Sequence, residues 1–151
     1  MSMDAQMILG LDTASNNRTQ GVTFLNVNQA GRLKVAFNGQ SYDGVIDSGA
    51  NHYVFPRPVN DRCPNMEFFC MDSPQDHSVL ISSFSGTSSR AITLTITGAN
   101  YYYDWAVQPG LSGYVQGNSE FILGLPFFYG RKTFIAIQGQ PSAAATNPAF
   151  G

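Results

Sequence analysis

Hydrophobic and polar residues alternate in four short runs along the chain. The runs are Gly21–Val27 (GVTFLNV), Arg32–Gly39 (RLKVAFNG), Ala91–Gly98 (AITLTITG) and Thr133–Gly139 (TFIAIQG). A period of two places successive side chains on opposite faces of a strand, and β-branched and aromatic residues dominate these runs. We therefore expect a β-strand at each run, and no segment shows sustained helical periodicity.

Two details of the pattern sharpen this expectation. The run at Ala91–Gly98 alternates strictly, with Ile92, Leu94 and Ile96 on one face and threonines on the other. Asn38-Gly39 is a strong hairpin signal, because a type I′ turn needs positive φ at both central residues. The fold class predicted from the pattern is all-β.

The length and composition predict one domain with a packed core. The chain has 151 residues, of which 43% are hydrophobic and 13% aromatic. Charged residues make up only 12%, about half the usual globular share of roughly 25%. A surface covered mainly by Ser, Thr, Asn, Gln and Gly is typical of secreted or periplasmic β-proteins, so we expect that location. The first residues, MSMDAQMILG, lack the basic region that opens a signal peptide.

Charge argues against a nucleic-acid partner, and hydropathy argues against a membrane span. The formal net charge is −2, and no cluster of Lys and Arg runs along the chain, so a nucleic-acid partner has no electrostatic support. No apolar stretch is long enough to span a bilayer. We expect neither nucleic acid binding nor a membrane span.

The two cysteines, Cys63 and Cys70, lie in the segment CPNMEFFC. A disulfide closing a short loop is one interpretation, and two free, buried thiols are the other. The spacing is too wide for a typical zinc knuckle, and His52 and His77 offer no matching pair, so we expect no metal and no cofactor. A disulfide would indicate an oxidising compartment.

Asp47 is the main candidate for chemistry. It follows the apolar run Val45-Ile46 and precedes Ser48-Gly49, so its carboxylate is expected in a tight turn at a strand end. Gly49 lets backbone N–H groups approach the carboxylate, and the Ser48 hydroxyl can brace the turn. The competing interpretation is an ordinary Asx turn, which favours the same residue types.

These residues resemble a known family. Asp47-Ser48-Gly49 resembles the catalytic Asp-Thr/Ser-Gly signature of pepsin-like and retropepsin-like aspartic proteases. The run Phe121–Gly124, which holds Ile122, Leu123 and Gly124, is similar to the hydrophobic–hydrophobic–glycine element behind the catalytic loop of these enzymes, part of their ψ-loop. The resemblance implies a single pepsin-like lobe, a partly closed β-barrel with a ψ-loop, in which Asp47 is catalytic.

The resemblance extends over roughly Met7–Gln138. Leu125–Ile137 is similar to the closing segment of a pepsin lobe, and Met7–Val27 is similar to the opening of its C-terminal lobe. The stretches VIDSGAN and GLPFFYGRKTFIAIQG, with the cysteine pair, also resemble a family of uncharacterised bacterial proteins with a pepsin-like C-terminal region. We expect one lobe over residues 1–140 and a flexible tail over residues 141–151.

A second acidic motif, LDTAS, has nearly the same lettering around Asp12. Ala14 stands where the motif needs a glycine, and its Cβ obstructs the close backbone approach. The C-terminal lobe of pepsin has a non-catalytic aspartate at the similar position. We therefore expect Asp12 to be scaffold.

The sequence also departs from the protease pattern. Ala50 stands where pepsins usually carry a Ser or Thr whose hydroxyl bonds the catalytic carboxylate, and Asn51 is the nearest replacement donor. No flap with a tip tyrosine is evident, and the hairpin Ser82–Arg90 is a candidate loop over the cleft. Tyr101–Val107 (YYYDWAV) is expected to contribute half-buried aromatic side chains that support a sheet.

The function expected from the resemblance is hydrolysis of peptide bonds in a peptide or protein substrate. Water would be activated by an aspartate dyad, but this chain supplies only Asp47. The second aspartate must come from a missing N-terminal lobe or from a second copy in a homodimer, and an isolated monomer should be inactive. The alternative is a non-catalytic binding or structural module that retains the aspartic-protease fold.

Overall fold

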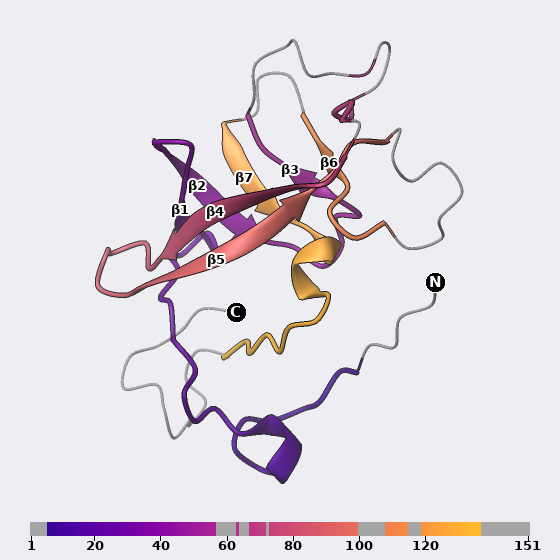
Figure 1. The fold of residues 1–151 in the computed structure, drawn as a ribbon. Coiled ribbons are helices and arrows are strands. Elements are labelled where there is room, and N and C mark those ends of the chain that lie inside the picture. The colour runs from indigo at the N-terminus through magenta and orange to yellow at the C-terminus, as the bar shows by residue number, and fades with distance from the viewer. Residues whose placement is uncertain are drawn as a thin grey trace.

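The computed structural model describes residues 6–56, 63, 67–71, 73–99, 108–114 and 119–136. These residues form a seven-stranded sheet, and the helical elements among them are short 3₁₀-helices, η1 (Ser15–Asn17) and η4 (Leu125–Phe128). The strands are β1 (Leu33–Phe37), β2 (Gln40–Ile46), β3 (Tyr53–Val54), β4 (Gln75–Ser82), β5 (Ser89–Ile96), β6 (Ser112–Gly113) and β7 (Glu120–Leu123). Figure 1 shows the sheet curled into a half-barrel, in the order β5-β4-β1-β2-β7-β3-β6. The all-β prediction is confirmed.

Two hairpins build one half of the sheet. Strands β1 and β2 are joined at Asn38 and Gly39, whose φ values of 49° and 76° give the two positive centres predicted for this turn. Strands β4 and β5 pair antiparallel over their whole length. Leu94 and Ile96 face the core and Ile92 is half-buried, so the predicted alternation is confirmed.

Strand β7 lies between two strands that precede it in the chain. It runs parallel to β2, with Ile46 beside Leu123, and antiparallel to β3, with Val54 beside Ile122. Strands β2 and β3 are consecutive and are joined by residues 47–52. This topology, one strand inserted between two strands that a loop connects, is a ψ-loop.

Phenylalanine rings form the centre of the core. Phe55 stacks on Phe121 of β7 with ring centroids 5.2 Å apart, and Phe37 of β1 meets both rings edge-on. Phe69 packs against Phe55 from the segment that leads to β4. Burying each such ring contributes about 1.5–3 kcal/mol, so the core fixes the strands on either side of the 47–52 loop.

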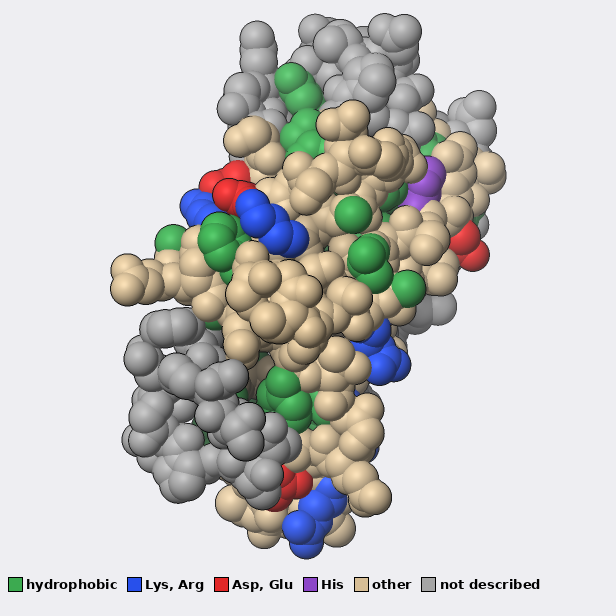
Figure 2. All heavy atoms as spheres, turned by 90° about the vertical axis from the view of Figure 1, so that its left-hand side faces the viewer, with side chains coloured by type: hydrophobic (Ala, Val, Ile, Leu, Met, Phe, Trp, Pro, Cys, Tyr) green, Lys and Arg blue, Asp and Glu red, His purple; other side chains and the backbone are tan. Residues whose placement is uncertain are grey.

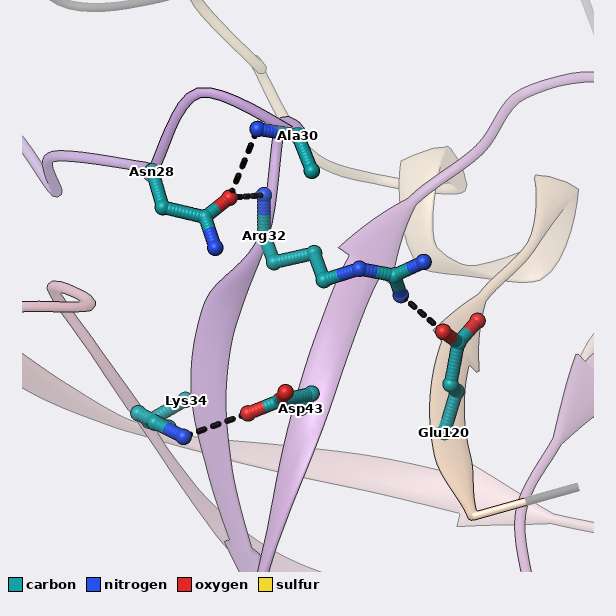
Figure 3. Close-up of polar contacts among 6 residues, drawn as sticks. All are labelled: Asn28, Ala30, Arg32, Lys34, Asp43 and Glu120. Atoms are coloured by element: carbon teal, nitrogen blue, oxygen red, sulfur yellow. Dashed lines mark hydrogen bonds and ion pairs between the residues drawn. The ribbon is translucent and has the colours of Figure 1, made fainter.

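Two ion pairs connect β1, β2 and β7 on the side of the sheet away from this core (Figure 3). Lys34 pairs with Asp43 across the hairpin, and Arg32 pairs with Glu120 of β7. The β2–β7 register places Asp43 directly beside Glu120, a like-charge neighbour pair that is unfavourable by itself. The two cations offset this repulsion. The two ion pairs therefore support the β2–β7 register, which places Leu123 at the end of β7 beside Ile46.

Charges are otherwise sparse on the surface. Figure 2 shows a face covered mostly by uncharged side chains and backbone, with small hydrophobic groups among them and basic and acidic side chains lying together at the upper left and at the bottom. This agrees with the low charged fraction of the sequence. No helix among the described residues has the length and apolarity needed to cross a membrane.

Two strand predictions are wrong over the described residues. Gly21 lies in a turn, and residues 22–27 form no strand ladder. Leu25 and Val27 pack against the core, while the Asn26 backbone N–H donates to the Ser83 hydroxyl and the Asn26 carbonyl accepts from the Phe84 N–H. Their alternation thus reflects one-sided packing. Residues 133–136 also lack a ladder. Residues 101–107, 137–139 and the tail 141–151 lie outside the described residues.

The chain before residues 133–136 shows why that segment does not extend the sheet. Arg131 donates from its guanidinium to the Thr93 carbonyl of β5, the strand at one end of the sheet that the described residues form. A strand added at that edge would need the same acceptor, so the side chain blocks pairing there.

Candidate functional site

Asp47 is the first residue after β2, and its position is set by the end of β7. Its backbone N–H donates to the Leu123 carbonyl, 3.0 Å away, which continues the β2–β7 ladder by one bond. Gly124 directly follows Leu123, the last residue of β7. The ψ-loop therefore brings together the two segments that sequence reasoning selected, Asp47–Gly49 and Ile122–Gly124.

The loop itself is an Asx turn with an exposed carboxylate. Gly49 N–H donates to Asp47 Oδ1 at 2.8 Å, and Ala50 N–H donates to the Asp47 carbonyl at 3.2 Å. Asp47, Ser48 and Gly49 are all exposed. A Cβ on Gly49 would lie 3.1 Å from Asp47 Oδ1, closer than side chains normally approach. The turn thus orients one carboxylate oxygen and leaves the other available to solvent.

Gly124 is required because the loop passes directly over it. A Cβ at this position would lie 2.1 Å from the His52 carbonyl oxygen and 2.7 Å from the Ala50 carbonyl oxygen. The same Ala50 oxygen accepts a hydrogen bond from Leu125 N–H at 2.6 Å. The loop is therefore seated on the backbone at the end of β7, and the absence of a side chain at Gly124 makes this contact possible.

The remaining loop residues contribute less than the sequence suggested. Ala50 is half-buried and brings no hydroxyl, whereas Ser48 and Asn51 are exposed. Among the described residues, neither the Ser48 hydroxyl nor the Asn51 amide makes a hydrogen bond to Asp47.

His52 packs against a second loop. Its ring meets Phe68 edge-on, with centroids 5.0 Å apart, and Gly113 lies beside it. Burial lowers the pKa of His52 from the ordinary 6.5, and the Glu67 carboxylate acts in the opposite direction. Cys63 and Cys70 form a disulfide that closes the loop carrying Phe68. No motif or spacing in the sequence predicts the contact between His52 and Phe68, which joins two different loops.

The Asp12 carboxylate stabilises the loop that contains it. Its carboxylate accepts hydrogen bonds from the Thr19 N–H at 2.8 Å and the Thr19 hydroxyl at 2.5 Å, and these bonds lower its pKa. Asn17 is 4% exposed, and its amide donates to the Gly10 carbonyl and the Thr13 hydroxyl. The motif LDTAS is thus the start of a hydrogen-bonded loop, in agreement with its expected role as scaffold.

The hairpin Ser82–Arg90 exists, and its described hydrogen bonds to other segments join it to residues 23–26 rather than to Asp47. Ser83 and Phe84 bond Asn26, and Arg90 donates to Thr23. No group of three or more His, Cys, Asp or Glu side chains among the described residues has the arrangement of a metal site. Over the same residues, no ion pair or hydrogen bond joins the Asp47 carboxylate to another acidic side chain.

Comparison with known proteins gives one finding. A family model described as a protein of unknown function, DUF3443, matches residues 1–150. Neither the curated proteins nor the solved structures give a match. Because the family match spans almost the whole chain, this protein belongs to the DUF3443 family.

Proposed function

We propose that this chain is one lobe of an aspartic endopeptidase in which Asp47 is half of a catalytic dyad. The observation that carries the proposal is the seating of the Asp47 loop on Gly124 inside a ψ-loop. An Asx turn at a strand end needs no strand behind it. Here β7 occupies that position, and the carboxylate is both oriented by Gly49 and exposed.

The chemistry requires a second carboxylate. Two carboxylates about 3 Å apart share one proton, since both cannot ionise together. The ionised group takes a proton from water as the water oxygen attacks the peptide carbonyl carbon, and the protonated group donates to the carbonyl oxygen. Collapse of the tetrahedral intermediate then breaks the C–N bond as the nitrogen is protonated. Asp47 supplies one of these groups, and a second copy or an N-terminal lobe supplies the other.

The disulfide supports a location for this activity. Stable disulfides form in oxidising compartments, so we propose a periplasmic or secreted protein.

One observation favours a second candidate function. Ala50 provides no hydroxyl to the carboxylate, and the described contacts leave Asp47 with the Gly49 donor. A lobe that lost proteolysis would keep the packing of the loop on Gly124 without needing that hydroxyl. The alternative proposal is therefore a non-catalytic binding or structural module with the aspartic-protease fold.

A peptide-library assay separates the two proposals. Cleavage is measured at acidic pH over a range of protein concentrations, with and without a pepstatin-like inhibitor, for wild type, Asp47→Asn and the matched control Asp12→Asn. The peptidase predicts cleavage that the inhibitor blocks, that Asp47→Asn abolishes and that Asp12→Asn retains. Rate per chain should rise with concentration if a second copy completes the dyad. Cleavage that survives Asp47→Asn would refute the mechanism, and no cleavage under any condition would favour the binding module.

A further inference from the structure

The Asp47 loop is held at three points. At its start, Asp47 N–H bonds the Leu123 carbonyl, and at its middle the Ala50 carbonyl accepts from Leu125 N–H. Both of these anchors are backbone hydrogen bonds to the end of β7. The third anchor is the His52 side chain at the end of the loop. It is the only side-chain anchor among these three.

The His52 ring fits against a place where two other segments meet. Phe68 forms an isolated bridge with Gly113, and the His52 ring lies against both residues. A Cβ on Gly113 would lie 3.1 Å from His52 Cδ2 and Nε2, so the missing side chain makes room for the ring. The ring is half-buried in this position.

The partner loop is itself fixed. The Cys63–Cys70 disulfide closes it over a separation of seven residues, and Cys63 N–H bonds the Phe68 carbonyl at 3.0 Å. On the other side, Phe69 N–H bonds the Ser112 carbonyl of β6 at 3.1 Å. Phe68 therefore lies between the disulfide-closed segment and β6, and it offers the His52 ring a packing surface.

Titratable groups lie on the segments that meet at His52. Among the described residues, the titratable groups on the packed segments are Glu67 and Tyr114, and those on its own segment are Asp47 and Tyr53. Burial lowers the pKa of His52, and the opposing attraction to Glu67 is the smaller effect. A histidine with a lowered pKa binds its proton more readily when its ring is exposed. Packing is therefore favoured above the ordinary pKa of 6.5 and is lost as pH falls through the lowered pKa.

We propose that His52 is a positioning residue for Asp47 and acts as an acid-sensitive latch. Neutral His52 holds the Asp47 loop against the disulfide-closed loop, and protonated His52 releases it. Tests of this latch need no cleavage assay, so its failure is distinguishable from failure of the proposed peptidase. If Asp47 is also catalytic, release of its loop would lower cleavage at the most acidic pH. It predicts that the Asp47 loop is more mobile at acidic pH while the rest of the sheet stays closed.

Hydrogen exchange on the intact protein tests the latch. Protection factors, corrected for intrinsic exchange, are compared at about pH 8 and about pH 5, on either side of the ordinary histidine pKa. We expect a several-fold loss of protection at acidic pH in residues 47–54 and none in the β4–β5 hairpin. His52→Phe keeps a ring against Phe68 without a titrating nitrogen and should abolish the loss. His77→Phe, at a histidine that packs on Phe37, is the matched control and should retain it.

A second measurement covers the case in which His52→Phe fails to fold. NMR titration of the wild-type histidine ring signals should give a pKa for His52 below the ordinary value, with the amide shifts of residues 47–51 following the same titration. Equal protection of the 47–54 segment at both pH values would overturn the proposal. Loop amide shifts that titrate with a different midpoint from His52 would overturn it as well.

Discussion

Substituting Gly124 by alanine tests whether the Asp47 loop is seated on β7 as described. Gly124 has φ −73° and ψ −167°, a backbone conformation open to alanine, so the effect is purely steric. The new Cβ would lie 2.1 Å from the His52 carbonyl oxygen, which would have to retreat by about 1.3 Å to reach ordinary contact. This oxygen and the Ala50 carbonyl oxygen, 2.7 Å away, are both backbone atoms, so no side-chain rotation relieves the clash.

The magnitude follows from what that retreat breaks. Overpacking alone costs about 1–3 kcal/mol, and the loop's two hydrogen bonds to Leu123 and Leu125 are worth about 1 kcal/mol each. We expect Gly124→Ala to lower the free energy of unfolding by about 3 kcal/mol. For a chain of this size, that corresponds to a fall in Tm of about 6–12 °C.

Urea unfolding measures this change, and Gly86→Ala is the control. Gly86 has φ 78° with nothing near its Cβ position, so alanine there meets left-handed backbone strain of about 1–2 kcal/mol and no clash. The loss at Gly124 should clearly exceed the loss at Gly86. If the two variants are equally stable, the loop does not rest on Gly124, and the steric reasoning is wrong.

Three further changes test other parts of the structure. Replacing both Cys63 and Cys70 by serine should lower the free energy of unfolding by about 2.4 kcal/mol, since the closed loop is short; reductant should reproduce this change in wild type, and its failure to do so would argue against the disulfide. Asp12→Asn should expose the Thr19 amide to hydrogen exchange at neutral pH, because the variant lacks the carboxylate that accepts from this amide. In wild type, protection of the Thr19 amide should hold above the ordinary pKa of 3.8 and fall only as pH drops through the lowered pKa of Asp12. Loss of this protection at a higher pH would contradict the assignment of Asp12 as the acceptor. Asn17→Ala removes three hydrogen bonds from a buried amide and should speed limited proteolysis within its loop by about 30-fold, equivalent to about 2 kcal/mol; unchanged cleavage would mean that the amide contributes nothing.

Local sequence signals predicted the parts of the fold that depend on neighbours in the chain. Asn38-Gly39 predicted a hairpin because its turn chemistry is complete within two residues. The alternation in β5 predicted its buried face, since a strand paired on one edge keeps one face inward. Alternation failed at residues 21–27, because a segment that packs on a core without pairing shows the same pattern.

The candidate site was predicted in part. Asp47 and Gly124 were selected by resemblance, and the structure places their segments in contact. The position of His52 on Phe68 depends on two loops that meet in space, and no spacing in the sequence encodes that meeting. The role of Asn17 was also missed, because no local pattern distinguishes a buried asparagine amide that organises a loop from an exposed one.

The insertion of β7 between β2 and β3 has a consequence for the order of folding. Strands β1, β2, β4 and β5 form antiparallel neighbours from the earlier part of the chain, and their contacts are available during synthesis. The Asp47 loop has no seat until Glu120–Gly124 has emerged from the ribosome and closed a long loop, which is slow on entropic grounds. A nascent or truncated chain that lacks β7 thus contains Asp47-Ser48-Gly49, but nothing holds the loop that positions the carboxylate. The geometry of the Asp47 loop is therefore among the last features to form, when most of the sheet is already in place.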